Sequence, residues 1–323
     1  MTGVLTMTPQ GLYCPAGDFH IDPWRACDRA VLTHGHSDHA RGGMAHYLCS
    51  EIAAPVIRHR LGRISLQTLR YGDALEIGGA RLSLHPAGHV PGSAQVRVEV
   101  AGEVWVVSGD YKTTPDRLCD PFEPVRCDVF ITECTFGLPL FRWEEEAVLA
   151  AQVNRWWAGL AAQGRPALID AYSFGKAQRL MTMVDRDIGP ILTHPAVEDV
   201  TAILRAQGLP LPVTRRLGPG AALPRGALVI APPGGGLMTG EPLVRAAASG
   251  WMALARRRGA GAGFVISDHA DWDGLNDAIT ATGAGRVLVT HGYTGPFRRW
   301  LAEARGLQAQ VLETAFGAGD GNG

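Results

Sequence analysis

A run of six residues, His34-Gly35-His36-Ser37-Asp38-His39, constrains this chain more than any other feature of its sequence. The run follows the apolar segment 30–33, which is typical of a buried strand. Imidazole nitrogens and carboxylate oxygens are ligands for zinc, manganese or iron. Because neighbouring side chains diverge, four donors at this spacing do not all reach one ion. The run therefore predicts two adjacent ions, one bound by His34 and His36 and one by Asp38 and His39, although a polar loop with surface histidines is the simpler alternative.

The bulk composition limits the class of protein. Of 323 residues, 46% are hydrophobic and 19% are charged, as in an ordinary globular protein. The six cysteines include no Cys-x-x-Cys pair, so we expect reduced thiols, a cytoplasmic location and a metal site made of nitrogen and oxygen ligands. We expect neither a signal peptide nor a membrane segment, because no apolar run approaches the roughly 18 residues of a membrane span.

The net charge of −1 differs from the basic excess of many nucleic-acid binders, so any contact with nucleic acid must be local. Each basic patch of the sequence also fits an ordinary solvated face. The patches are Arg215-Arg216, Arg256-Arg257-Arg258, Arg298-Arg299, and a smaller one at Lys176 and Arg179.

Strand-like and helix-like runs alternate along the chain, which predicts an α/β (α+β) fold. A segment rich in Pro and Gly interrupts them from 189 to 240, and the glycine-rich run 259–263 follows. We therefore expect an insertion at 136–262 within an outer domain formed by 1–135 and 263–323. Helices are expected at 144–162, 176–185, 196–207, 241–257, 271–282 and 296–305. Strands are expected near 29–33, 45–49, 80–85, 94–100, 103–108, 127–132, 166–170, 189–193, 226–231, 263–267, 285–290 and 309–313, with a hairpin turn at Ala101-Gly102.

Six of the expected strands lead into a histidine or a carboxylate, and strand ends that share one sheet edge would bring these side chains into one pocket. One ion would bind His34, His36 and His89. The other would bind Asp38, His39 and His291, and Asp110 would give one oxygen to each. Asp22 is a candidate for orienting a ligand histidine, with a turn cap as the alternative. The six residues at strand ends are His34, His89, Asp110, Glu133, His269 and His291.

The run at 34–39 matches the His-x-His-x-Asp-His motif without a gap, and so resembles the metallo-β-lactamase superfamily. Further segments narrow the resemblance to the β-CASP nucleases of that superfamily. The opening segment 11–24 is similar to the bacterial DNA ligase-associated exonuclease family. The segments that resemble β-CASP motifs are Thr-Glu-Cys-Thr-Phe-Gly at 132–137, Phe-Gly-Lys-Ala-Gln-Arg at 174–179, the glycine-rich loop 232–240, Ser-Asp-His-Ala-Asp at 267–271 and Thr-His-Gly at 290–292.

The resemblance implies an αββα sandwich with an inserted β-CASP domain. It implies the same seven metal ligands, and a catalytic set of His269, Glu133 and Asp38 in which His269 protonates the leaving oxygen and Glu133 orients it. Independently of the resemblance, Lys176 and Arg179 at the start of a helix are candidates for contact with a substrate phosphate, with a plain cap as the alternative.

The function implied by the resemblance is a DNA exonuclease that acts on single-stranded ends with two divalent ions, zinc or manganese, with iron also compatible. Its implied partners are an ATP-dependent DNA ligase and a helicase in DNA repair. The alternatives are an RNA-processing β-CASP ribonuclease, a thioester or lactam hydrolase on the same sandwich, and a non-catalytic scaffold.

Overall fold

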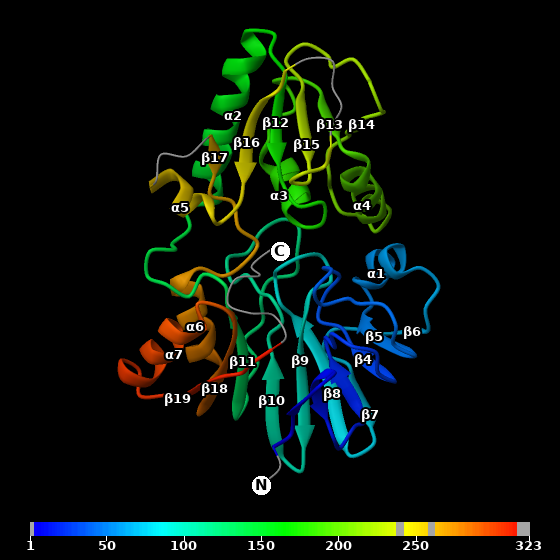
Figure 1. Cartoon of the computed structure of the whole chain (residues 1–323), viewed down its shortest axis with the longest axis vertical. Helices are drawn as coiled ribbons and strands as arrows, with labels where there is room; N and C mark the ends of the chain where they lie inside the picture. The colour runs from blue at the N-terminus through cyan, green and yellow to red at the C-terminus, as the bar shows by residue number, and fades with distance from the viewer. Residues whose placement is uncertain (1–2, 237–241, 258–261, 315–323) are drawn as a thin grey trace. The chain divides into compact units, whose positions relative to one another are not determined.

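The structure is a computed structural model that describes residues 3–236, 242–257 and 262–314. The chain divides into two compact units, shown in Figure 1: unit 1 contains residues 1–142 and 269–323, and unit 2 contains residues 143–268. Helices and strands mix in both units, with seven helices in the described ranges. The predicted α/β class is confirmed.

Unit 1 contains two sheets, which we call sheet A and sheet B. Sheet A has the strand order β1-β2-β3-β4-β5-β6, and sheet B has the order β19-β18-β11-β10-β9-β8-β7. The strands of sheet A are β1 (Thr6–Thr8), β2 (Gly11–Cys14), β3 (Phe19–Ile21), β4 (Arg29–Val31), β5 (His46–Ser50) and β6 (Leu66–Leu69). Those of sheet B are β7 (Ala74–Ile77), β8 (Ala80–Pro86), β9 (Ala94–Val100), β10 (Glu103–Val107), β11 (Val129–Cys134), β18 (Arg286–Gly292) and β19 (Gln308–Val311).

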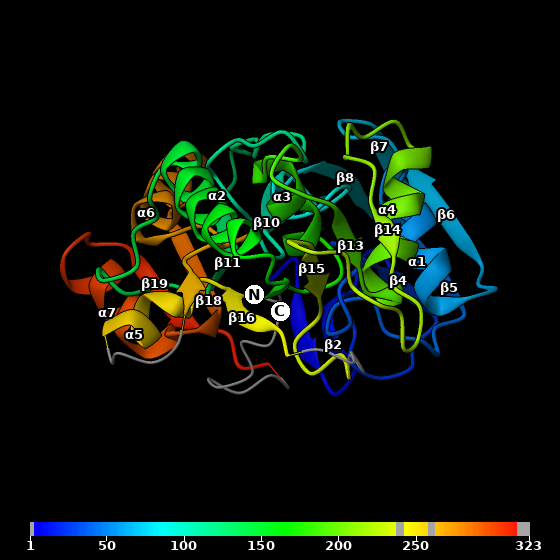
Figure 2. The same cartoon turned by 90° about the horizontal axis from the view of Figure 1, so that it is seen from above.

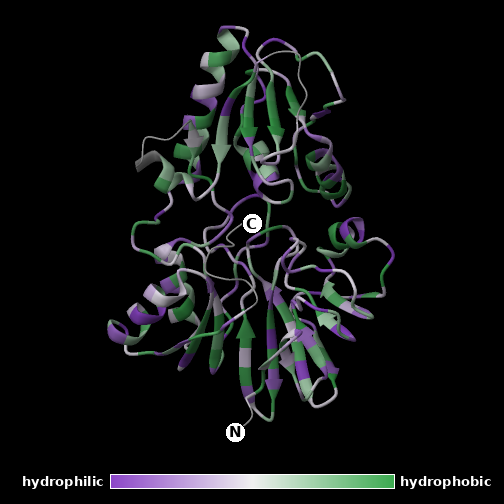
Figure 3. Cartoon of the chain, in the orientation of Figure 1, coloured by the Kyte–Doolittle hydropathy of each residue, from purple (hydrophilic) through white to green (hydrophobic). Residues whose placement is uncertain are grey.

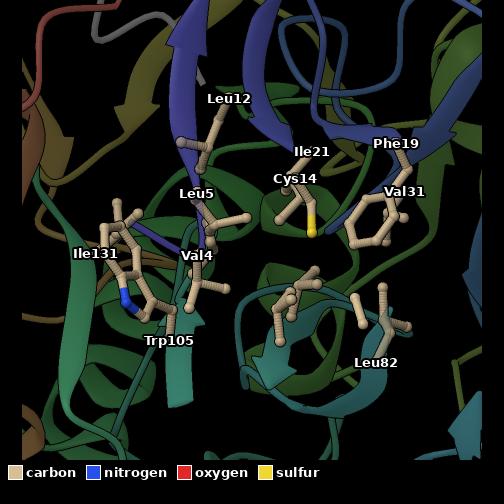
Figure 4. Packing of buried hydrophobic residues seen from close by; sticks show 14 of the residues in the cluster. Val4, Leu5, Leu12, Cys14, Phe19, Ile21, Val31, Leu82, Trp105 and Ile131 are labelled. Carbon is tan, nitrogen blue, oxygen red and sulfur yellow. The ribbon is translucent and has the colours of Figure 1, made fainter. Parts of the chain in front are cut away.

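Apolar side chains from both sheets form one core between them, so the two sheets of unit 1 stack face to face. Figure 4 shows Leu12, Phe19 and Val31 of sheet A in the same cluster as Leu82 and Trp105 of sheet B. The alternation of Leu82 and Leu84 with polar residues in β8 places both leucines on this inner face.

Helices cover the outer faces of both sheets of unit 1. Helix α1 (Ala54–Leu61) packs through Ala54 and Ile57 against residues of β4 and β5. Helices α6 (Trp272–Thr282) and α7 (Thr294–Glu303) pack against β11 and β18, and Figures 1 and 2 both show them side by side. The layers therefore follow the order helix, sheet, sheet, helix, as the resemblance implies.

The strand directions in sheet B bring four strand ends to one edge. The hairpin at Ala101 (φ 50°) and Gly102 (φ 87°) joins β9 to β10, as predicted. Because β8 and β10 are each antiparallel to β9, they run in the same direction. Strands β11 and β18 are parallel to β10 and to each other. The carboxyl ends of β8, β10, β11 and β18 therefore lie at the same edge.

Unit 2 contains a parallel six-stranded sheet with the order β14-β13-β15-β12-β16-β17. Its central strands are buried, and Figure 3 shows β12 and β15 as mostly hydrophobic. Helices α2 and α3 cover one face through Val153, Trp157 and Leu180. The elements are α2 (Glu146–Ala162), β12 (Ala167–Asp170), α3 (Lys176–Met183), β13 (Ile191–Thr193), α4 (Pro195–Ala206), β14 (Arg215–Arg216), β15 (Leu228–Ala231), β16 (Val244–Ala248), α5 (Met252–Arg257) and β17 (Gly263–Phe264).

The predicted helix 241–257 is wrong over its first half, where the chain forms strand β16 beside β12. The other predicted helices and the predicted strands are found within a few residues of their expected positions. Part of the glycine-rich loop, 237–240, and of the second glycine-rich run, 259–261, lies outside the described residues, as does Arg258. Among the helices in the described part of the chain, none has the length and apolar character needed to cross a membrane.

Candidate metal centre

Two groups of side chains that could hold a metal ion lie at the carboxyl-end edge of sheet B and the adjoining end of β4. His34 and His36 follow β4, His89 follows β8 and Asp110 follows β10. Their ligand atoms all lie within 4.8 Å of one another. His36 Nδ1 is 3.1 Å from both His34 Nε2 and His89 Nε2. Asp110 Oδ2 is 3.6 Å from His34 Nε2 and 3.7 Å from His89 Nε2.

These separations match a tetrahedral site. With metal–nitrogen distances of 2.0–2.1 Å, the edge of a tetrahedron of ligands is about 3.3 Å. The four side chains are therefore already at the spacing that a zinc-sized ion requires. They fit such an ion in donor type as well as in geometry.

The second group contains His39, Asp110 and His291, whose ligand atoms also lie within 4.8 Å of one another. His39 Nε2 is 3.6 Å from Asp110 Oδ1 and 3.7 Å from Asp38 Oδ2. Asp110 thus presents Oδ2 to the first group and Oδ1 to the second. The structure brings together all seven residues that the sequence analysis assigned as ligands.

The backbone around the second group has several irregular features that place its side chains. His291 has a positive φ of 53°, which is uncommon outside glycine and typical of functional sites. A register shift between Glu133 and Cys134 lies beside it in β11. Gly109 (φ 57°) permits a close approach of two strand ends, because a Cβ there would lie 2.7 Å from Thr33 Cβ.

Asp22 fixes the orientation of His39. Its Oδ2 lies 2.7 Å from His39 Nδ1 and accepts a hydrogen bond of 2.6 Å from Thr33 Oγ1. Its Oδ1 accepts the backbone N–H of Thr33 at 2.8 Å. With Nδ1 engaged, His39 directs Nε2 toward Asp38 and Asp110. This is the arrangement by which an outer carboxylate holds a ligand histidine.

The ionisation of His34 and His291 favours metal binding, whereas at His39 three carboxylates, Asp110, Asp22 and Asp38, outweigh burial and raise the pKa to about 10. Burial lowers the pKa of His34 well below its usual value, and the neighbouring imidazoles lower it further. Burial also lowers the pKa of His291 to about 4, and His39 adds to the effect. Both rings are neutral at neutral pH, which is the form that binds a metal. Burial raises the pKa of Asp110 to about 7, although the charge of His39 opposes the shift.

Glu133 and His269 form a buried pair in unit 1, separate from the two groups of ligands. Glu133 Oε1 lies 2.7 Å from His269 Nδ1 and accepts the backbone N–H of Tyr111 at 3.1 Å. Its Oε2 accepts the N–H and the hydroxyl of Thr135. Burial opposes the charge on Glu133, but His269 and these hydrogen bonds outweigh it and lower the pKa. The carboxylate stays ionised and holds the imidazole through Nδ1, which leaves Nε2 as its other nitrogen.

Lys176 and Arg179 lie in unit 2 at the start of α3, and both side chains are buried. Lys176 Nζ is 3.2 Å from Asp268 Oδ1 and 4.6 Å from the centre of the Tyr172 ring. Gln178 caps the helix by accepting the N–H of Gly175. Contact of Lys176 and Arg179 with a substrate stays a prediction.

Sequence reasoning missed the residues that hold the chemical groups in place: Thr33, Tyr111 and Thr135. Each acts through a hydroxyl or a backbone N–H, which most residues in a sequence also offer. The only available signal was that each lies within two residues of a predicted site residue.

No protein-family model matches the chain. It is 30% identical over 313 residues to a protein of Opitutus terrae named "Probable DNA ligase", and the match covers 94% of this chain and 30% of that protein. It is 30% identical over 140 residues to the endoribonuclease ysh1 of Aspergillus fumigatus, over 42% of this chain and 15% of that protein. The chain thus spans less than a third of either relative.

The fold has a counterpart among solved structures. A crystal structure of a protein of unknown function from Enterococcus faecalis V583 matches with a TM-score of 0.56 at 10% identity, over 81% of this chain and 74% of that one. The chain belongs to the metallo-β-lactamase superfamily and, within it, to the β-CASP branch.

Proposed function

We propose that the chain is a metal-dependent nuclease that hydrolyses phosphodiester bonds of DNA as an exonuclease, from single-stranded ends. One observation carries the proposal: two donor groups share Asp110, and the buried Glu133–His269 pair lies in the same unit. Two donor groups that share a carboxylate are what two-metal hydrolysis requires. The Glu133–His269 pair would supply an acid for a leaving alkoxide.

The first ion would bind His34, His36, His89 and Asp110, and the second would bind Asp38, His39, His291 and Asp110. Zinc and manganese both suit these donors, and iron is compatible. When bound, such ions lower the pKa of a water molecule toward neutrality and neutralise phosphate charge.

The chain's own residues supply positioning and a proton. Glu133 holds His269 through Nδ1, so His269 Nε2 is the nitrogen that would donate the proton to the departing oxygen. Asp22 keeps His39 in one orientation. Asp38 completes the proposed catalytic set from the 34–39 loop.

DNA is the proposed substrate because the similarity to the protein named as a DNA ligase covers 94% of this chain, whereas the similarity to an endoribonuclease covers 42%. The same relationship supports a link to a DNA ligase, and the proposal includes a place in DNA repair beside an ATP-dependent ligase and a helicase. We assign the metallo-β-lactamase domain to 1–135 and 263–323 and the inserted β-CASP domain to 136–262. RNA processing is the alternative that the endoribonuclease similarity favours.

Side-by-side digestion tests the proposal. The full chain is stripped of metal, loaded with manganese or zinc, and given end-labelled DNA and RNA strands of the same sequence, with a β-lactam and a thioester as further substrates. We expect stepwise shortening of single-stranded DNA that chelation abolishes. Asp110→Asn should be inactive, and Asp73→Asn, which changes an exposed carboxylate, should be fully active. Preferred cleavage of RNA or of the small substrates would overturn the assignment.

A further inference from the structure

His89 reaches the first group of ligands from a loop, residues 87–93 between β8 and β9, which we call the His89 loop. The side chain of His89 is fully buried, and its Nε2 lies 3.1 Å from His36 Nδ1 and 3.7 Å from Asp110 Oδ2. A metal site tolerates errors of only about 0.2 Å in its ligand distances. The backbone of the His89 loop therefore decides whether this imidazole lies at ligand distance from an ion.

One hydroxyl, that of Ser93, holds the turn that carries His89. Ser93 Oγ accepts the backbone N–H of His89 at 3.0 Å and that of Val90 at 3.2 Å. The backbone N–H of Ser93 donates in turn to the carbonyl of Val90 at 2.8 Å. A serine side chain that binds nearby backbone groups in this way fixes a turn outside any helix or strand. Ser93 is only 2% exposed, so water does not compete for these bonds.

The backbone at Ser93 is attached to three other elements of unit 1. Its carbonyl accepts the hydroxyl of Tyr71, between β6 and β7, at 2.8 Å. The carbonyl of the preceding glycine accepts the hydroxyl of Ser50, at the end of β5, at 2.6 Å. The following residue donates its N–H to the carbonyl of Thr33, after β4, at 2.8 Å. The oxygen that binds the His89 N–H is therefore fixed relative to sheet A, which leads into the other two histidines of the first group.

The second group of ligands is held by different contacts. Asp22 accepts from Thr33 and binds His39 Nδ1 at 2.7 Å, which orients a ligand of that group. None of the four ligands assigned to the second ion belongs to the His89 loop. Only Asp110 is shared by the two groups, and it follows β10. The contacts of Ser93 therefore act on one of the two proposed ions.

We propose that Ser93 is a positioning residue for the first ion, which holds the His89 imidazole at ligand distance through the backbone of the His89 loop. Outer hydrogen bonds that orient a ligand typically account for about 10- to 100-fold in metal affinity. Loss of the Ser93 hydroxyl should therefore weaken the first ion and leave the second ion tightly bound. This inference rests on the proposed metal-dependent function and gives one of its two ions a separate support.

Cobalt(II) titration of the metal-stripped full chain, followed by absorbance, tests the proposal in variants that keep one site each. His291→Ala removes a ligand of the second group and leaves the first site, whereas His36→Ala leaves the second site. In the His291→Ala background, Ser93→Ala should weaken cobalt binding about tenfold. In the His36→Ala background, Ser93→Ala should leave the cobalt affinity unchanged.

Three further variants separate positioning from packing, all in the His291→Ala background. Ser93→Thr keeps the accepting oxygen and should bind cobalt more tightly than Ser93→Ala. Ser50→Ala removes another buried hydroxyl bound to the same loop, but one that does not contact the His89 N–H, and should have a smaller effect than Ser93→Ala. Tyr71→Phe removes only the hydroxyl bound to the Ser93 carbonyl. If Ser93→Ala does not fold, Tyr71→Phe gives the same test with a smaller expected loss.

Turnover of single-stranded DNA, with both groups of ligands intact, gives a second measurement. Ser93→Ala should need about tenfold more metal than the wild type for half of its maximal rate. Its kcat at saturating metal should match the wild type, because the bound ion then holds His89 in place. A general loss of packing would instead lower kcat at every metal concentration.

The outcomes separate this proposal from the proposed function. If the wild type cuts DNA but Ser93→Ala and Tyr71→Phe bind cobalt at the first site as tightly as their parent, the role of Ser93 is wrong and the nuclease stands. An equal loss of affinity in the His36→Ala and His291→Ala backgrounds, or an equal loss in Ser50→Ala, would also overturn it. If Ser93→Ala weakens only the first ion but the wild type cuts no DNA, the nuclease is wrong and the role of Ser93 stands.

Discussion

Unit 1 and unit 2 each contain a buried or half-buried cluster of polar side chains, and the two clusters differ in how their charge is balanced. In unit 2, Glu198 and Arg205 pair at 2.8 Å, and the hydroxyls of Thr193 and Thr214 donate to the same carboxylate. In unit 1, burial keeps the imidazoles of His34 and His291 neutral, while three carboxylates, Asp110, Asp22 and Asp38, outweigh burial and raise the pKa of His39 to about 10. The first cluster pairs its carboxylate with a guanidinium and hydroxyls, whereas in the second three carboxylates share the charge of His39 and the other imidazoles at tetrahedral spacing are left as neutral donors.

The difference shows how the two kinds of cluster are recognised. A buried carboxylate that has a guanidinium and hydroxyl donors stabilises its local structure. Buried carboxylates that share one charged imidazole and otherwise face neutral imidazoles at tetrahedral spacing are costly for the fold alone, and such costs are found at functional sites. The comparison therefore predicts that changes in unit 1 alter function and metal binding, whereas changes in unit 2 alter stability.

His269→Ala is expected to have the largest effect. Removing a general acid costs about 10²- to 10⁴-fold in rate, so kcat on single-stranded DNA should fall by that factor. Metal content, measured by elemental analysis, should match the wild type because the seven predicted ligands remain. His59→Ala, which removes an exposed histidine of α1, is the matched control. Loss of bound metal in His269→Ala would show that this residue is a ligand instead.

Metal should stabilise unit 1. An ion that binds only the folded form adds about 2.7 kcal/mol at 100 times its dissociation constant. Adding manganese or zinc to the stripped chain should therefore raise the unfolding temperature in a thermal scan. His36→Ala should remove this rise, because it deletes a donor that lies 3.1 Å from two others. Glu198→Gln, in unit 2, should retain it, and an equal loss in both variants would break the comparison.

Glu198→Gln should destabilise unit 2 by about 1–2 kcal/mol at pH 7, because a largely buried guanidinium loses its charged partner. Burial opposes the charge of Glu198, but hydrogen bonds from Thr193, Thr214 and Arg205 outweigh it and lower the pKa. A lowered carboxyl pKa contributes stability above the unfolded value of about 4.3, and this is lost as pH falls through the folded pKa.

The difference between wild type and Glu198→Gln should therefore be largest near neutral pH and shrink below about pH 4. Hydrogen exchange of the α4 amides, read by mass spectrometry of the peptides of unit 2, measures it. If the stability difference between wild type and Glu198→Gln is as large at low pH as at neutral pH, then packing, and not charge, is what Glu198 contributes to the cluster.

The strands that carry the site were predictable, whereas several others were not. Strands β4, β8, β10, β11 and β18 have apolar runs that lead into a polar residue, so both their position and their chemistry can be read from the sequence. Strands β1 to β3 have three or four residues each, too few for a periodic pattern. The error at Val244–Ala248 has a different cause: three consecutive alanines favour a helix locally, but parallel pairing with β12 overrides that preference.

The site was predictable in its donor types and not in its supporting contacts. Histidines and carboxylates at strand ends indicate a metal centre because few other roles use them at that spacing. The backbone N–H of Tyr111 that binds Glu133 has no signature, since every non-proline residue carries one. The exposure of Trp300 could not be predicted from the sequence either, because a tryptophan in a helical pattern with apolar residues is more often buried.

The smallest expected effect tests whether burial, and not charge pairing as such, separates the two clusters. Arg70 and Glu51 of unit 1 pair at 3.1 Å, much as Arg205 and Glu198 do, but 76% and 56% of their side chains are exposed. Exposed pairs contribute about 0.2–1 kcal/mol, because water screens them and two long side chains must be ordered. A double-mutant cycle of Glu51→Gln and Arg70→Gln should give a coupling energy below about 0.5 kcal/mol that falls with added salt. A coupling as large as that between Glu198 and Arg205, and insensitive to salt, would mean that pairing geometry alone sets the strength, and the contrast between the units would then lose its basis in burial.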